Sequence, residues 1–201
     1  MVAIAGYDMT MSTALRMPRV SVEEYLAGEA SSAIKHEYVD GRIYAMSGRK
    51  NAHNRLASRV LVSLGRQLDG NRCEPFNSDT KIRIRHGERT YFYYPDVSVV
   101  CDSNSDAEVF QDRPVVIVEV LSDSTRRIDE GEKRDRYFLV DSLDTYVLLE
   151  VDRPMATVFQ RVEKTGEFVS TIYEGDAAIS LPVIDSSITF ADIYGDRNPP
   201  V

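Results

Sequence analysis

The 201-residue chain has no tryptophan and only two cysteines, Cys73 and Cys101. Without tryptophan there is no visible aromatic platform for stacking sugars, which places a glycoside hydrolase last among the candidate functions. The two cysteines do not have the spacing of a metal-binding pattern. We therefore expect two separate thiols, as is usual in a reducing cytoplasm.

Long apolar runs are missing as well. The longest, such as PVVIV at 114–118 and YVLL at 146–149, are far too short to span a bilayer. The first residues also lack the basic start and continuous apolar segment of a secretory signal. We therefore expect a cytoplasmic protein without membrane association or organic cofactor. The length predicts one domain over residues 21–195, between a flexible arm at 1–20 and a tail at 196–201.

Positive charge is scarce. The 24 lysines and arginines are outnumbered by 32 aspartates and glutamates, which gives a net charge of -8. This balance argues against a protein that coats nucleic acid through general positive charge. Any attraction to nucleic acid must come from a local basic patch.

The N-terminal half carries clear local signals. Ser21 followed by Glu24 is a capping box and predicts a short helix. Asp40-Gly41 divides two short runs in the manner of a β-hairpin. Apolar residues three or four apart then predict a long helix over 51–69.

The later segments alternate between strand and helix patterns. TKIRIRHG at 80–87 predicts a strand with one solvated basic face, and YPDVSVV at 94–100 follows a short turn at Gly87. PVVIVEVL at 114–121 is apolar on both faces, which is typical of a central strand. TRRIDEGEKRDRYFLV at 125–140 predicts a helix, followed by strands in TYVLLEV and ATVFQRV. The whole predicts an α/β (α+β) fold with a mixed central sheet flanked by helices. Its order is helix–three strands–helix–strand, with an extra N-terminal hairpin and further C-terminal strands.

Two carboxylates interrupt these apolar strands. Asp96 lies at the start of YPDVSVV, and Glu119 lies inside PVVIVEVL, 23 positions later. If the strands are neighbours, the pair shares one site at the sheet's edge. A Mg²⁺ ion, which prefers oxygen ligands, would remove the repulsion between the two carboxylates. In the structural alternative, Asp96 caps a loop and Glu119 forms a buried salt bridge with an arginine.

A lysine follows on the next predicted helix. Asp129, Lys133 and Tyr137 are spaced four apart, so they share one face of that helix. A lysine near the strand end can orient an attacking water or stabilise negative charge on a phosphate. The alternative is an exposed Asp129–Lys133 pair on the helix surface.

The series YPDVSVV, RPVVIVEVLSDST and DEGEKRDRY resembles the restriction-endonuclease (Uma-two) family of the PD-(D/E)XK nuclease superfamily. The likeness covers roughly residues 20–195 and implies a restriction-endonuclease-like core. It implies that Pro95-Asp96 is the PD of the motif and that Glu119 is the acidic residue of its second half. The superfamily has lysine two positions further on, where this chain has Leu121. The family pattern implies that Lys133 takes that role.

Two further positions match the family less strictly. Glu37 resembles an acidic residue just before the family's first hairpin, and is a candidate third metal ligand or hydrogen-bond acceptor. His53 resembles a histidine near the start of the long helix, which could relay a proton or touch a phosphate. In the alternatives, Glu37 pairs with Lys35 or an arginine, and His53 is a solvated residue at the helix start.

The leading hypothesis from this resemblance is a metal-dependent DNA endonuclease. Asp96, Glu119 and the Val120 carbonyl would hold Mg²⁺, for which Mn²⁺ can substitute. Lys133, positioned by Tyr137 and Asp129, would act on the attacking water or the phosphate. The candidate catalytic residues are Asp96, Glu119, Lys133, Glu37, His53 and Tyr137.

Three basic clusters could meet DNA phosphates, although each is also readable as a solvated face. They are Arg55, Arg59 and Arg66 on the long helix, Lys81, Arg83 and Arg85 on a strand, and Arg126, Arg127 and Arg134 near the site. A rival hypothesis is a nuclease-fold module too altered to cut, which binds nucleic acid or protein. Another is a hydrolase that uses the carboxylate pair without metal. A homodimer would suit an enzyme that cuts both strands of a duplex.

Overall fold

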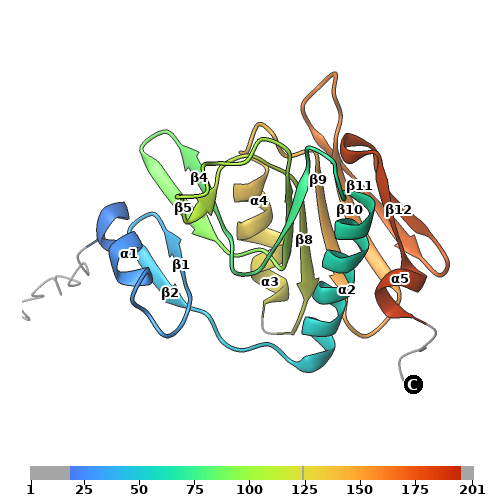
Figure 1. Cartoon of the computed structure of the whole chain (residues 1–201), viewed down its shortest axis with the longest axis horizontal. Coiled ribbons are helices and arrows are strands. Elements are labelled where there is room, and N and C mark those ends of the chain that lie inside the picture. Colours follow the sequence, from blue (N-terminus) through green and yellow to red (C-terminus); the bar gives the residue numbers. More distant parts are fainter. Residues whose placement is uncertain (1–18, 124, 196–201) are drawn as a thin grey trace, which may run out of the picture.

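The computed structural model describes residues 19–123 and 125–195 (Figure 1). The predicted tail and nearly all of the predicted arm lie outside the described residues. The helical elements are α1 (Val22–Glu29), α2 (Asn51–Gln67), α3 (Arg126–Ile128), the π-helical turn η1 (Asp129–Lys133), α4 (Arg134–Tyr137), the 3-10 turn η2 (Pro182–Ile184) and α5 (Phe190–Tyr194). The strands are β1 (His36–Val39), β2 (Arg42–Ala45), β3 (Glu74–Asn77), β4 (Lys81–His86), β5 (Arg89–Tyr93), β6 (Val97–Val100), β7 (Phe110–Gln111), β8 (Pro114–Leu121), β9 (Thr145–Glu150), β10 (Met155–Arg161), β11 (Phe168–Glu174), β12 (Ala178–Leu181) and β13 (Ser186–Thr189).

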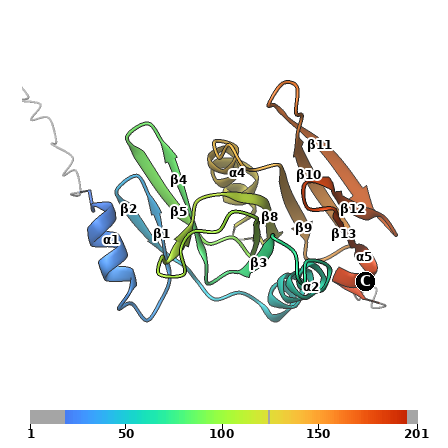
Figure 2. The same ribbon diagram turned by 45° about the horizontal axis from the view of Figure 1, so that its top comes forward.

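Most strands belong to two larger sheets, which lie on opposite sides of the molecule in Figure 2, while β12 and β13 form a small third sheet. One has the order β2–β1–β5–β4–β7, and the other has the order β11–β10–β9–β8–β6–β3. Both are mixed, because β8 pairs with β9 and β4 pairs with β7 in parallel while their other pairings are antiparallel. The predicted α+β class with mixed sheets and flanking helices is confirmed.

One strand boundary differs from the sequence expectation. The turn at Gly87 leads not into the strand that contains Asp96 but into β5, which pairs with β4 and with β1. Residues 94–96 then carry the chain across to β6 in the other sheet. Asp96 therefore lies where the chain passes from one sheet to the other.

Strand β8 is the centre of the core, as its two-sided apolar pattern predicts. Val116, Val118 and Val120 belong to the same buried cluster as Leu56, Val60 and Leu64 of α2. The alternate residues, including Ile117 and Leu121, belong to a second cluster with Tyr137 of α4. Helix α2 and the α3–η1–α4 helix thus cover opposite faces of the sheet (Figure 1). Glu119 lies between Ile117 and Leu121 and so projects from the α3–η1–α4 side.

The local signals near the N-terminus are confirmed. Ser21 and Glu24 make both hydrogen bonds of the capping box at the start of α1. The β1–β2 hairpin turns at Asp40 and Gly41, which have φ values of 47° and 89°. Both residues lie in the left-handed region that a tight hairpin turn requires. This hairpin brings Glu37 of β1 toward the end of β8.

The expectation of two separate thiols is wrong, because Cys73 and Cys101 form a disulfide. Strands β3 and β6 pair with Glu74 opposite Val100, so the next step along this antiparallel register brings the two cysteines together. Disulfides persist mainly in oxidising compartments. The two cysteines therefore do not support a cytoplasmic location, which stays a prediction.

The basic face predicted for residues 80–87 is only partly solvated. Lys81 is buried, with its ammonium 3.2 Å from the carbonyl of Val109, and Arg83 pairs with Asp112 at 2.7 Å. Arg85 is exposed. This strand therefore uses two of its three cations for internal contacts.

None of the helices in residues 19–123 and 125–195 combines the length and the apolar character that crossing a bilayer requires.

Candidate active site

The sheet register brings Asp96 and Glu119 together. Strands β6 and β8 are antiparallel, with Val97 opposite Val118. Asp96 directly precedes Val97, so it lies beside the end of β8 that carries Glu119 and Val120. Asp96 is 8% exposed and Glu119 is 1% exposed. The two carboxylates therefore lie at neighbouring strand ends, near enough for the charge of Asp96 to help raise the pKa of Glu119, after burial as the main cause.

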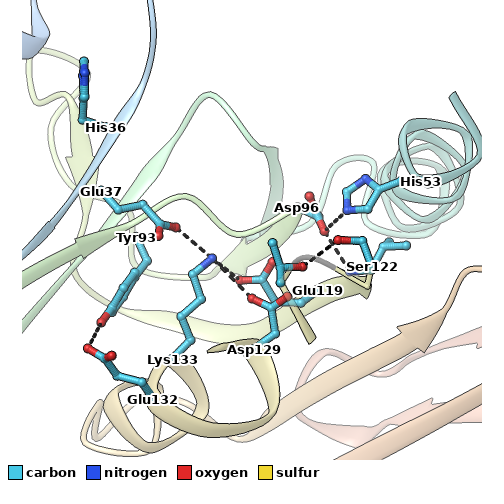
Figure 3. A network of polar contacts seen from close by, with 12 residues as sticks. His36, Glu37, His53, Tyr93, Asp96, Glu119, Ser122, Asp129, Glu132 and Lys133 are labelled. Atoms are coloured by element: carbon cyan, nitrogen blue, oxygen red, sulfur yellow. Dashed lines mark hydrogen bonds and ion pairs between the residues drawn. The ribbon is translucent and has the colours of Figure 1, made fainter. Parts of the chain in front are cut away.

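Asp96 is held from two directions (Figure 3). Its Oδ2 accepts a hydrogen bond from the backbone N–H of Val120 at 2.8 Å. The same oxygen lies 3.1 Å from His53 Nε2. His53 comes from the first turn of α2 and is 2% exposed, so the alternative of a solvated histidine is wrong.

Lys133 lies among three carboxylates (Figure 3). Its Nζ is 2.8 Å from Glu37 Oε1, 3.4 Å from Glu119 Oε1 and 3.6 Å from Asp129 Oδ1. Lys133 is 2% exposed, so an exposed surface pair with Asp129 is ruled out. Glu37 pairs with Lys133 and not with Lys35, which contacts Asp79. Glu119 also pairs with Lys133, and not with an arginine as the structural alternative expected.

The π-helical turn η1 sets the direction of the lysine. The helix predicted at 125–140 is present, but its middle turn, Asp129–Lys133, is π-helical between α3 and α4. Asp129, Lys133 and Tyr137 all face inward, as their spacing predicts. Tyr146 of β9 fixes the turn by donating a hydrogen bond to the Asp129 carbonyl at 2.9 Å. Single π-helical turns inside helices are frequent at functional sites.

Carboxyl groups outnumber cationic groups in this cluster. Burial raises the pKa of the Glu119 carboxyl well above its ordinary value; Lys133 opposes the rise, and Asp129, Asp96 and Glu37 add to it. Burial alone would lower the pKa of Lys133, but Glu119, Glu37 and Asp129 outweigh burial and raise it. Lys133 is therefore a firmly held ammonium ion. This one cation is shared by three carboxylates, Glu37, Glu119 and Asp129, with Asp96 nearby.

Tyr137 lies beneath this cluster. It is fully buried, with its ring 5.7 Å from Tyr93 and 5.6 Å from Tyr146 between centroids. Within the described part of the chain its hydroxyl has no hydrogen-bond partner. Burial and the nearby Glu119 carboxyl raise the pKa of Tyr137. Leu121 packs in the same apolar cluster, which accounts for an apolar residue at that position.

The donor set suits a hard divalent cation. Carboxylate oxygens are the ligands that Mg²⁺ prefers, and one or two protein carboxylates are usually enough. Asp129 Oδ1 and Glu37 Oε1 are buried, and each lies against the ammonium of Lys133. Among those residues, no three His, Cys, Asp or Glu side chains already stand in a metal-binding arrangement. Lys133 lies between Glu37, Asp129 and Glu119, while Asp96 faces the N–H of Val120.

Arg49 belongs to the site but was not among the residues picked from the sequence. It lies in the segment between β2 and α2, and its positive charge opposes the rise that burial causes in the pKa of Asp129. A basic residue just before the helix that carries His53 is the signal that could have found it. Other predicted cations are already paired, since Arg126 contacts Glu150 and Arg134 contacts Asp135.

The Arg126–Glu150 pair fastens α3 to the end of β9. Arg126 Nη1 donates to Glu150 Oε1 at 2.8 Å, and Nη2 contacts the second oxygen. This hydrogen bonding lowers the pKa of Glu150 below its ordinary value of 4.5, against the opposing effect of burial. A depressed pKa means that the stabilisation is present above pH 4.5 and is lost as the pH falls through the folded-state value.

We therefore expect Glu150→Gln to lower the free energy of unfolding by about 1 kcal/mol at neutral pH, because a charge-assisted hydrogen bond becomes a neutral one. Urea unfolding at neutral pH and at about pH 3 should show the difference from wild type shrinking in acid. Glu130→Gln is the control, because Glu130 is the more exposed partner of Arg126. An equal loss in both variants would contradict a special role for Glu150.

Comparisons with known proteins identify the family of the chain. The model of the Uma2 family, described as "Putative restriction endonuclease", matches residues 22–191, which confirms the resemblance seen in the sequence motifs. The "Uncharacterized protein slr1290" of Synechocystis sp. is 34% identical over 178 residues, covering 88% of this chain and 92% of that protein. The "Uncharacterized protein sll1609" of the same organism is 28% identical over 134 residues, covering 65% and 75%.

A solved structure shows the same fold. It is the crystal structure of "a putative nuclease belonging to DUF820" from Anabaena variabilis. The TM-score is 0.69 at 15% sequence identity, over 87% of this chain and 97% of that chain.

Proposed function

Because the chain belongs to the Uma2 family of restriction-endonuclease-like proteins, we propose that it is a Mg²⁺-dependent endonuclease that hydrolyses DNA. The family supports a nuclease-like function. The observation that carries the proposal is the buried Asp96–Glu119 pair with the Lys133 ammonium 3.4 Å from Glu119. It supplies an oxygen donor from each of two neighbouring strand ends and a fixed cation beside one of them.

In the proposed site, Asp96, Glu119 and the Val120 carbonyl would hold the metal. When bound, Mg²⁺ would lower the pKa of a water and neutralise charge on the phosphate. Lys133 is a positive charge placed to stabilise the negative charge that builds on the phosphate. It stays protonated, so it acts as an electrostatic group and a hydrogen-bond donor, not as a base.

The remaining candidate residues act on these groups. His53 lies against Asp96 and can hold a proton or contact a phosphate oxygen. Glu37 and Asp129 fix the Lys133 ammonium. Tyr137 packs under the cluster and keeps it dry. We further propose a cytoplasmic enzyme that acts as a homodimer, because a duplex cut needs two active centres or one used twice.

Replacing Asp96 by asparagine tests the proposal. Asparagine keeps the shape and can still accept from Val120, but it removes the charge. We expect cleavage of plasmid DNA in Mg²⁺ to fall by about 100-fold or more, since metal-ion catalysis contributes several kcal/mol to lowering the barrier. Asp79→Asn is the control, because Asp79 is an exposed partner of Lys35.

Undiminished cleavage by folded Asp96→Asn protein would exclude this site. If the wild type binds DNA but does not cut it under any divalent cation, the chain is instead a nuclease-fold binding module. Leu121 in the superfamily's lysine position is the feature that favours this second reading.

A further inference from the structure

Three hollows adjoin one another across the molecule. A hollow of about 340 Å³ is lined by Glu37, Asp129 and Lys133, and one of about 530 Å³ is lined by Asp96. The segment between β2 and α2 separates them, and its Arg49 lines both. Glu37 and Asp129 are therefore reached from one side of this short segment, and Asp96 is reached from the other side.

The third hollow continues from the second. It has a volume of about 760 Å³ and lies between α2 and the C-terminal elements β13 and α5. Ser58 of α2 lines both this hollow and the one that contains Asp96. A path therefore runs from the carboxylates, past Arg49, and over α2 at Ser58.

The chain along this path has an unusual charge. Residues 41–68 contain six lysines and arginines and no aspartate or glutamate, although the whole chain has a net charge of -8. Every acidic side chain of the protein thus lies outside the segment that forms most of the path. This segment is the local basic patch that an acidic protein needs in order to attract a polyanion.

Helix α2 presents three of these charges in a row. Arg55, Arg59 and Arg66 all line the third hollow. At about 1.5 Å per residue the first and last are about 16 Å apart along the helix, the axial length of about five phosphates of one DNA strand. Asp192 also lines this hollow, and its carboxylate already accepts from the Thr189 hydroxyl at 2.7 Å.

Hydroxyl groups accompany the arginines. Ser58 and Ser63 line the same hollow, and serine hydroxyls commonly contact phosphate and sugar, whereas Gln67 and Thr189 are already hydrogen-bonded to Ser187 and Asp192. Arg59 also donates to the Ile193 carbonyl at 3.0 Å, so it has a structural contact, while Arg55 and Arg66 are exposed.

We propose that the DNA backbone follows this path, with Arg49 next to the scissile phosphate and the Arg55–Arg59–Arg66 row holding phosphates beyond it. This inference rests on the proposed function for its substrate and adds the surface along which the substrate lies. It excludes the basic face of β4 as the main contact, because Lys81 and Arg83 are used internally.

The test is binding of a fluorescent DNA duplex by anisotropy in Ca²⁺, so that cleavage is not needed. We expect Arg55→Ala/Arg66→Ala to bind at least about fivefold more weakly and to reduce the slope of log K against log salt by about 2. The matched control is Arg85→Ala/Lys164→Ala, which removes the same charge from exposed positions elsewhere. It should bind like the wild type. Arg49→Ala should also weaken binding, and melting curves check that all variants fold.

The outcomes separate this inference from the proposed function. Equal losses in the helix variant and the control would show general electrostatics and overturn the path. A loss in Arg49→Ala alone would keep DNA at the site but remove it from α2, which also overturns the path. A wild type that binds with the predicted losses but cuts nothing leaves the path standing and removes the nuclease activity. If Arg55→Ala/Arg66→Ala binds and cuts DNA like the wild type, the nuclease activity stands and the path over α2 is overturned.

Discussion

Replacing Lys133 by methionine should lower the free energy of unfolding by about 3–5 kcal/mol, the usual cost of removing one partner of a buried ion pair. The ammonium is 2% exposed and lies within 3.6 Å of Glu37, Glu119 and Asp129. Methionine fills much of the same space, so the loss comes from charge and not from a cavity. Chemical denaturation at neutral pH measures it.

Lys35→Met provides the matched control. Lys35 also forms a lysine–carboxylate pair at 2.8 Å, but its partner Asp79 has a side chain 76% exposed. The expected cost there is below about 1 kcal/mol. The double variant Lys133→Met/Glu119→Gln should recover part of the loss, because one of the uncompensated carboxylates is then neutral. A Lys133→Met protein as stable as the wild type would mean that the carboxylates are already neutralised by protons.

The carboxylate pair could be predicted from the sequence because apolar strands make a buried charge conspicuous. Asp96 and Glu119 each break a β-branched run, and the run around Glu119 is apolar on both faces. The spacing of Asp129, Lys133 and Tyr137 identified the inward face of the next helix. Helical periodicity survives there even though the middle turn is π-helical. Local patterns therefore predicted which side chains of these segments point into the protein.

The contacts made across the two sheets could not be predicted in this way. Glu37 reaches Lys133 only because β5 joins the N-terminal hairpin to β4, and no local pattern separated β5 from the segment that follows it. The disulfide was missed for a similar reason. It depends on the register between β3 and β6, and β3 is a short strand with no alternating pattern. Long-range register is not visible in a single sequence.

We expect Glu119→Gln to be at least as stable as the wild type without a divalent cation, and less stable than the wild type when the cation is present. Without metal the variant should be at least as stable as the wild type, because burial of the Glu119 charge is unfavourable and Lys133 keeps Glu37 and Asp129 as partners. With Mn²⁺ at about 100 times its dissociation constant, the wild type should gain about 2.7 kcal/mol. For a chain of this length that is a rise in Tm of about 5–10 °C. The variant should gain little, since it lacks one of the two proposed ligands.

Thermal melts with chelator and with Mn²⁺ measure both halves, and calorimetric titration of Mn²⁺ gives the affinity directly. Glu150→Gln is the control, because it removes a mostly buried carboxylate from the neighbouring strand end without touching the cluster, and it should keep the full response to Mn²⁺. If Glu119→Gln is instead much less stable without metal, Glu119 serves Lys133 as a structural partner. If Mn²⁺ stabilises neither protein, the excess carboxyl groups are protonated. The site then lacks the negative charge that binding a cation requires.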